Sequence, residues 1–216
     1  MTVNRAPSSE RGGAIDHGEV VVPFRVPREH VRPTTEFKST WLTASLATLR
    51  ARGHFPRYLE LLPATYHEPV LGSIAGVWIP VEVCYAHYRA CDALGLSVQE
   101  QLAIGRGVLD RLQKTIFSLA FRIAREVGVT PWTMLRTFPA EFERQWRGGA
   151  CGVFQVGPKD ARIELIGFPV AEIPYARIAL RGMAIGLCEL VCARAYVQDV
   201  RELCNATTIA YRVAWA

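Results

Sequence analysis

The stretch ACGVFQVGPKDARIELIGF, residues 150–168, decides the fold of this chain. Two runs of mostly apolar and β-branched residues, 150–156 and 161–168, flank the segment GPKD at 157–160, whose composition suits a turn. Two strand-forming runs separated by turn residues are typical of a β-hairpin. We therefore predict a β-hairpin at 150–168.

Helical periodicity precedes this hairpin and returns after it. Apolar spacing and flanking Gly or Pro predict helices at 36–52, 56–62, 80–94, 97–127 and 174–192. A further helix is predicted from residue 130, with an interruption at Pro139. Strands are predicted at 193–200 and 207–215. Residues 64–78, which contain two glycines and a proline, are expected to form a loop. The order predicts an α+β fold, with N-terminal helices packed on a C-terminal antiparallel sheet of about four strands and one inserted helix.

Two sequence features bear on the long helices. Ser97 and Glu100 predict a capping box, in which the Ser97 side chain bonds a free amide of the first turn and Glu100 reaches back to the Ser97 amide. Gly105 and Gly107 predict a bend or a split within 97–127. The glycines at 182 and 186 indicate close packing along the helix 174–192.

The composition is that of a globular protein. Of the 216 residues, 50% are hydrophobic and 21% are charged, which excludes a disordered chain, a collagen-like repeat and a coiled-coil rod. We predict one α+β domain over residues 35–216, preceded by a flexible tail over 1–34. The apolar run at 20–24 in that tail is either a docking strand or part of the tail.

The sequence predicts no membrane span, because charged residues interrupt every apolar stretch. Residues 1–18 lack the apolar core of a signal peptide, so we expect a cytoplasmic protein.

Six cysteines without C-x-x-C spacing are expected to be reduced and buried. The net charge of +5 is too small to indicate a nucleic-acid clamp.

Three segments carry a family resemblance. They are GVWIP at 76–80, the segment from LRTFP at 135–139 to Trp146, and TIAYRVAW at 208–215. Over roughly residues 55–216 the chain resembles an uncharacterised bacterial family allied to the ligand-binding fold of haem-NO-binding, 4-vinyl-reductase and TRAPP-subunit proteins. The resemblance implies a non-enzymatic sensory or scaffold module, often dimeric, that holds a small apolar or haem-like ligand between helices and sheet. It also implies that haem is a candidate cofactor.

The chain departs from the haem-NO sensors of this fold at one motif. Those sensors carry Tyr-x-Ser-x-Arg, which binds the porphyrin propionates, whereas the nearest run here is YAHYR at 85–89, with His87 in place of the serine. This departure puts haem binding in doubt. The small apolar ligand remains the expectation, together with a homodimer.

The candidate ligand-binding residues centre on one predicted helix. Cys84, His87 and Cys91 are spaced i, i+3 and i+7, so they share a helix face that could line a pocket, hold a metal or haem iron, or simply pack in the core. Trp78 and Phe117 complete the set, because each lies on or beside a predicted core-facing helix.

Two other functions remain open. An interaction module would bind a partner protein or nucleic acid through an arginine-rich face, although acidic residues interrupt that face and favour a solvated surface. Its basic residues are Arg106, Arg111, Lys114, Arg122, Arg125, Arg136, Arg144 and Arg147. An enzyme would use His67, which lies beside Glu68 in the predicted loop, or His87 as acid or base.

Overall fold

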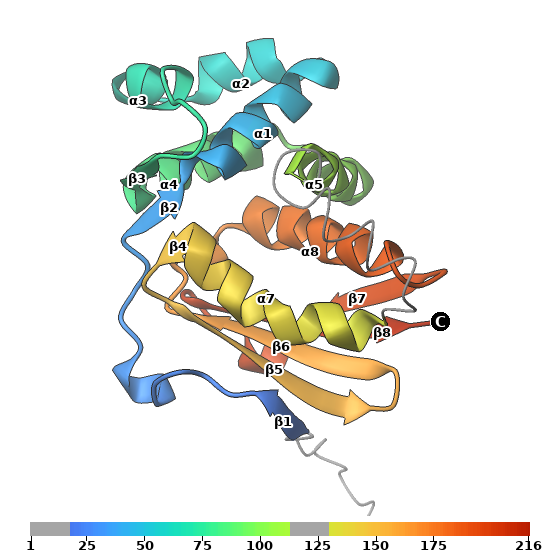
Figure 1. Ribbon diagram of the computed structural model, residues 1–216. Helices are drawn as coiled ribbons and strands as arrows, with labels where there is room; N and C mark the ends of the chain where they lie inside the picture. Colours follow the sequence, from blue (N-terminus) through green and yellow to red (C-terminus); the bar gives the residue numbers. More distant parts are fainter. Residues whose placement is uncertain (1–17, 113–129) are drawn as a thin grey trace, which may run out of the picture.

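A computed structural model describes residues 18–112 and 130–216 of the chain (Figure 1). The predicted α+β class is confirmed. In chain order the elements are β1 (Glu19–Val22), β2 (Glu36–Lys38), α1 (Ser39–Ala51), α2 (Phe55–Leu61), α3 (His67–Leu71), β3 (Trp78–Pro80), α4 (Val81–Asp92), α5 (Val98–Leu112), α7 (Pro131–Gln145), β4 (Trp146–Arg147), β5 (Ala150–Gly157), β6 (Asp160–Ile166), α8 (Pro174–Glu189), β7 (Ala195–Asp199) and β8 (Thr208–Trp215). Short 3-10 turns lie between some of them.

The main sheet is antiparallel, with five strands in the order β1-β5-β6-β8-β7. The predicted hairpin is β5 and β6, in which Val153 lies opposite Ile163. The predicted closing strands are β7 and β8, which pair with each other, and β8 also pairs with β6. The fifth strand is β1, so the apolar run at 20–24 begins as a docking strand on β5.

A second, smaller sheet joins distant parts of the chain. Its strands β3, β2 and β4 contain two or three residues each and pair antiparallel. Strands of this length show no periodicity in a sequence, which is why the sequence did not predict them. Residues 64–78, expected to form a loop, contain the helix α3. This helix has five residues, which is also too short to show a periodic pattern.

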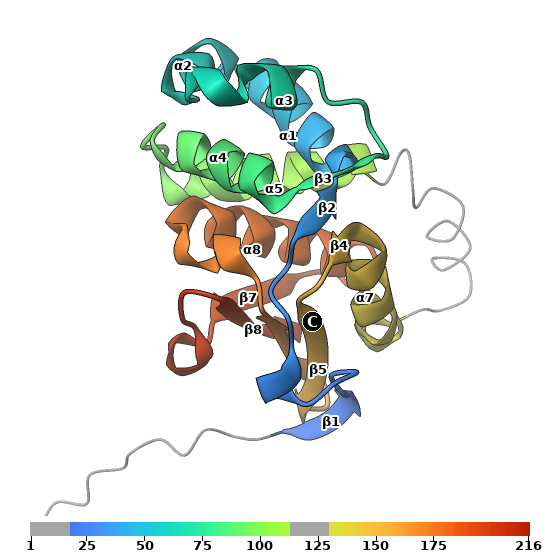
Figure 2. The ribbon, with the colours of Figure 1, turned by 90° about the vertical axis from the view of Figure 1, so that its left-hand side faces the viewer.

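The helices form layers on one side of the main sheet (Figures 1 and 2). Helices α7 and α8 lie against the sheet, α4 and α5 pack on α8, and α1 and α2 pack on that second layer. Among the described residues, no helix has the length and hydrophobicity needed to span a membrane.

Helices α5 and α8 touch backbone to backbone. A Cβ atom at Gly105 would lie 2.0 Å from the carbonyl oxygen of Ala179, and one at Gly182 would lie 2.3 Å from that of Leu102. These glycines therefore permit close packing, as predicted for Gly182. The predicted split at Gly105 and Gly107 does not occur, because α5 is continuous across both residues. The rest of the predicted helix, 113–127, lies outside the described residues.

Helix α7 also continues where an interruption was expected. It runs through the buried Pro139, which lacks an amide hydrogen and so forgoes one helical hydrogen bond. Because α7 packs along β5 and ends in β4, tertiary contacts stabilise the helix on both sides of the proline.

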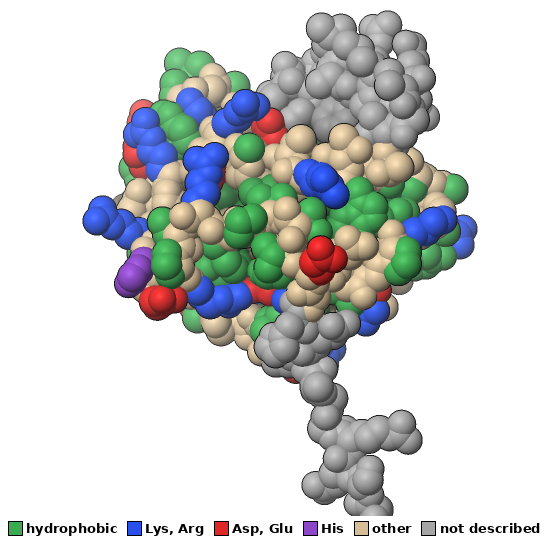
Figure 3. All heavy atoms as spheres, turned by 60° about the horizontal axis from the view of Figure 1, so that its bottom comes forward, with side chains coloured by type: hydrophobic (Ala, Val, Ile, Leu, Met, Phe, Trp, Pro, Cys, Tyr) green, Lys and Arg blue, Asp and Glu red, His purple; other side chains and the backbone are tan. Residues whose placement is uncertain are grey.

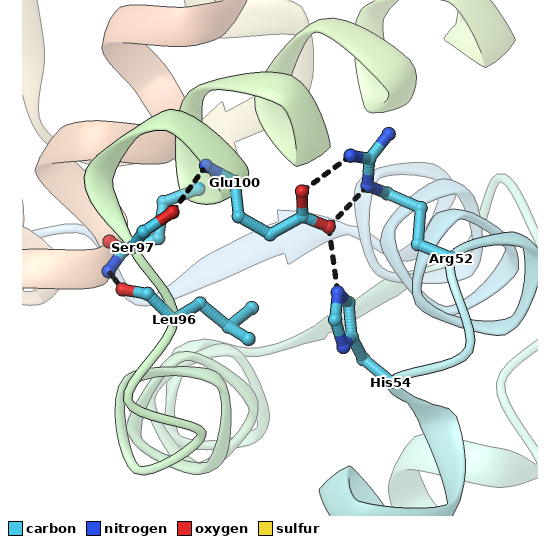
Figure 4. Close-up of polar contacts among 6 residues, drawn as sticks. Arg52, His54, Leu96, Ser97 and Glu100 are labelled. Carbon is cyan, nitrogen blue, oxygen red and sulfur yellow. Dashed lines mark hydrogen bonds and ion pairs between the residues drawn. The ribbon is translucent and has the colours of Figure 1, made fainter.

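Half of the predicted capping box forms (Figure 4). The Glu100 amide donates to the Ser97 hydroxyl at 3.2 Å, as expected. The Glu100 carboxylate instead accepts from both Nε and Nη2 of Arg52, at 2.6 and 2.5 Å, and pairs with Nε2 of His54 at 2.7 Å. These partners hold the pKa of Glu100 at about 2, well below its usual value. A charged pair therefore replaces the local cap and ties α5 to the end of α1.

The N-terminal segment covers part of the sheet face opposite the helices. Glu164 on β6 is buried there and accepts from Nε of Arg162 at 2.7 Å, and Arg28 also donates to it. Phe24 packs edge-on against Phe154. Figure 3, turned so that the lower side of Figure 1 comes forward, shows apolar and charged side chains interspersed on the surface.

Candidate functional site: an apolar cavity between helices and sheet

The described residues enclose a cavity of about 320 Å³ between α7, α8 and the sheet. This volume is at the lower end of the range for small-molecule sites, which runs from about 300 to 1,000 Å³. Ile163 and Leu165 on β6 form its floor, because they point toward the helices, whereas their neighbours on the strand point to the opposite face. Helix α8 contributes Met183 and Leu187, one turn apart.

Aromatic side chains form the end of the cavity near β4. Trp146 packs edge-on against Phe168, with ring centroids 4.7 Å apart, and stacks on Phe37 at 5.4 Å. Phe142 stacks on the same indole at 6.2 Å. Trp41 of α1 lies 5.9 Å from Trp146 and donates its indole N–H to Oε1 of Gln145 at 3.1 Å. These rings pack against one another, and Trp41, Phe142 and Trp146 line the cavity at this end.

Most polar groups in the described lining are hydrogen-bonded within the protein or uncharged. The Tyr211 hydroxyl donates to the carbonyl of Arg177 at 2.5 Å, and burial raises the pKa of this tyrosine well above its usual value. Burial also raises the pKa of Cys188 to about 12, so its thiol is protonated at neutral pH. Thr137 donates to the carbonyl of Met134 at 2.9 Å. Among the described lining residues, only Glu141 belongs to a type that is charged at neutral pH.

The three residues predicted to share a face of one helix do so, in the core of the helical layers. Cys84, His87 and Cys91 are buried on α4, and Sγ of Cys91 lies 3.7 Å from Nε2 of His87. The His87 ring shares hydrogen bonds with Tyr58 at Nδ1, 2.8 Å, and with Ser45 at Nε2, 2.9 Å. Burial lowers the pKa of His87 to about 3, so its ring is neutral.

These residues lie apart from the cavity. None of the described residues of the predicted set lines it, and within 18–112 and 130–216 no group of three His, Cys, Asp or Glu side chains is placed to hold a metal ion. Trp78 lies on β3, and two cations contact its ring: Nζ of Lys38 and Cζ of Arg147 each lie 4.4 Å from the ring centroid. Phe117 lies outside the described residues. A ligand-binding role for this set stays a prediction.

Some residues of the alternative functions have partners within the chain. Arg106 pairs with Glu189 at 3.1 Å, and Arg111 donates to Thr48 at 3.2 Å. Lys114, Arg122 and Arg125 lie outside the described residues. His67 lies 2.9 Å from the carbonyl of Leu62, which orients the ring toward its own chain segment.

The YAHYR run also has a local partner. Arg89 donates to Tyr85 and to Glu172, both at 2.7 Å, and Tyr85 also donates to Glu172. The tyrosine and arginine of this run therefore bind a carboxylate of the same chain.

Sequence reasoning missed the residues of α7 and α8 that line the cavity. The signal was present, since Met134, Leu135, Phe138 and Phe142 recur at helical spacing. That spacing is equally typical of a helix packed on a filled core. Only the arrangement of α7 beside α8 distinguishes a cavity from a core.

No family model matches the chain, and no curated protein matches it in sequence. Solved structures do match. An unliganded Fe(II) H-NOX protein from K. algicida has a TM-score of 0.60 and 9% identity, over 83% of this chain and 96% of that one. An oxygen-binding H-NOX domain related to soluble guanylate cyclases has a TM-score of 0.56 and 12% identity, over 82% and 94%. The chain therefore has the fold of H-NOX domains.

Proposed function

We propose that this chain is a non-enzymatic sensory or scaffold module that binds a small, largely apolar molecule in the cavity between α7, α8 and the sheet. The observation that carries the proposal is the cavity itself, whose described lining is aliphatic and aromatic apart from a few polar side chains. A largely apolar, partly enclosed pocket with few polar groups is the usual form of a small-molecule site. The structurally similar oxygen-binding H-NOX domain supports a ligand-binding use of this fold.

The chemistry of the lining favours binding over catalysis. Cys188 is the thiol of the described lining, and its raised pKa of about 12 leaves it protonated and therefore a weak nucleophile. His87 is held between two hydroxyl groups in the core, away from the cavity.

The described residues do not fit haem. Haem iron takes a histidine, a thiolate, a methionine beside a histidine, or a tyrosinate as its axial ligand. No histidine lines the cavity within the described residues, and His17 lies outside them. Cys188 and Tyr211 are kept protonated by burial. The charged group of the described lining is the carboxylate of Glu141. It would repel the propionates of haem, which need a cationic partner.

Binding of a neutral apolar dye to the full chain tests the proposal. 1-N-phenylnaphthylamine fluoresces in apolar surroundings, and Trp41 and Trp146 in the lining should transfer energy to it. Ala184→Trp fills the cavity from α8 and should weaken dye binding at least tenfold. Ala140→Trp is the matched control, because Ala140 is exposed on α7 and does not line the cavity. Equal dye binding by both variants would refute the assignment of the cavity.

A spectrum and a native mass of the purified protein complete the test. We expect a copurifying small molecule or the bare chain mass, without a Soret band. A Soret band with a bound haem mass would contradict the fit of the described residues and restore haem as the ligand.

A further inference from the structure

The cavity has one charged side chain in its described lining, and that charge is negative. Glu141 lies on α7, with its side chain 27% exposed, so the carboxylate is at the rim. Arg144 pairs with it at 2.6 Å, but Arg144 is 71% exposed and does not line the cavity. A carboxylate can accept about four hydrogen bonds, so this partner leaves acceptor capacity for a ligand.

Gln145 lies one turn further along the same helix and also lines the cavity. Its Oε1 accepts from the Trp41 indole at 3.1 Å. This bond fixes the orientation of the amide, because the oxygen faces the indole, and the NH₂ group is left as a donor. Residues four apart share a helix face, so the carboxylate of Glu141 and the amide of Gln145 lie on one wall.

We propose that the ligand is an amphiphile with an apolar body and a neutral or cationic end group, an amine or a hydroxyl, which donates to Glu141. This inference rests on the proposed function and adds the polarity of the ligand. An ammonium or hydroxyl group gains a hydrogen bond to a carboxylate, which is stronger than one to a neutral acceptor. A ligand carboxylate beside Glu141 meets a like charge and has no proton to donate to it.

Displacement of 1-N-phenylnaphthylamine from the full chain at pH 7 tests this polarity. The competitors are octylamine, 1-octanol and octanoate, which share one apolar body and differ in their end group. We expect octanoate to bind at least tenfold more weakly than octylamine, a difference of about 1.4 kcal/mol. Octanol should fall between them.

Substitutions at the rim assign the effect to one side chain. Glu141→Gln should bring octylamine and octanoate to within about threefold of each other, or about 0.6 kcal/mol, and Glu141→Lys should reverse their order. Glu143→Gln is the matched control, because Glu143 lies on the same helix and pairs with Arg25 at 2.6 Å but does not line the cavity. It should keep the preference of the parent chain.

The outcomes separate this inference from the proposed function. If octanoate competes as well as octylamine, or if neither substitution at Glu141 changes their ratio, the inference is overturned while dye binding still supports the cavity. If the parent chain does not bind the dye at all, the proposed function fails and this inference fails with it.

Discussion

The buried histidine on α4 makes the stability of this protein depend on pH. The pKa of His87 is lowered from 6.5 to about 3, because its ring is buried and a charge there would lose its hydration. Between these values the unfolded chain binds a proton at this histidine and the folded chain does not. The unfolded state therefore binds more protons, and the free energy of unfolding must fall as the pH falls from about 6.5 toward 3.

The size of the effect follows from this difference in pKa. One pH unit within the window corresponds to about 1.4 kcal/mol, so lowering the pH from 7 to 4.5 should remove about 2.7 kcal/mol of stability through His87 alone. His87→Gln has no proton to bind. We expect it to lose stability at pH 7, by about 1–3 kcal/mol, because a buried hydrogen-bonding group loses its partner. Between pH 7 and pH 4.5, the free energy of unfolding of this variant should fall by about 2.7 kcal/mol less than that of the parent chain.

Urea unfolding of both proteins at pH 7 and pH 4.5 measures this difference. Carboxylates also titrate over this range, but they are common to both chains and cancel in the comparison. His30→Gln is the control, because His30 is exposed and lies far from α4 in the sequence. Equal losses of stability by the parent and His87→Gln on acidification would show that His87 is not a buried neutral base. An NMR titration of the His87 ring in the parent, expected to show no protonation above pH 4.5, gives a second test.

The other predictions concern packing, the hydrogen bond to His87 and assembly. Gly182→Ala should destabilise the fold by about 2–3 kcal/mol in urea unfolding, because its methyl would meet backbone atoms of Leu102. Gly186→Ala should change stability by less than about 1 kcal/mol, because its methyl would meet only side-chain atoms, of Leu109 at 3.0 Å and Arg106 at 3.6 Å. Tyr58→Phe should cost about 1–3 kcal/mol at pH 7, since it removes the hydroxyl 2.8 Å from Nδ1 of His87; an unchanged unfolding midpoint would contradict this. The expected homodimer should appear in sedimentation at twice the mass of the chain, and a single species of monomer mass would rule it out.

The elements that the sequence predicts best are those with long periodic patterns or clear turn chemistry. The hairpin at 150–166 combines two strand-like runs with a turn, and the two closing strands are rich in apolar and aromatic residues. What the sequence misses is set by contacts between distant segments. The strands β2, β3 and β4 exist because they pair with one another, and Glu100 leaves its local cap because Arg52 offers a stronger, charged partner.

The candidate site shows the same limit at the level of side chains. The pattern at 84, 87 and 91 correctly predicts a shared helix face, since helical spacing is a local property. Whether such a face borders a cavity depends on what packs against it. Here the face is buried, with α8 and α2 packed on α4 and Ser45 of α1 bonded to His87. The apolar face of α7 has the same kind of spacing but borders an open volume.

A shared backbone fold therefore does not determine the side chains of the interior. The backbone follows that of H-NOX domains at 9–12% identity, so most aligned side chains differ. The structure places the imidazole of His87 between hydroxyl groups in the helical core. The described lining of the cavity is mainly aliphatic and aromatic, with a few polar groups and the carboxylate of Glu141. An apolar cavity retains an apolar ligand without any metal bond, and the charge at its rim then decides which end groups it accepts. The same scaffold can hold ligands of different chemistry because the helices and sheet fix the place of the cavity, whereas a few side chains on α7 and α8 fix its polarity.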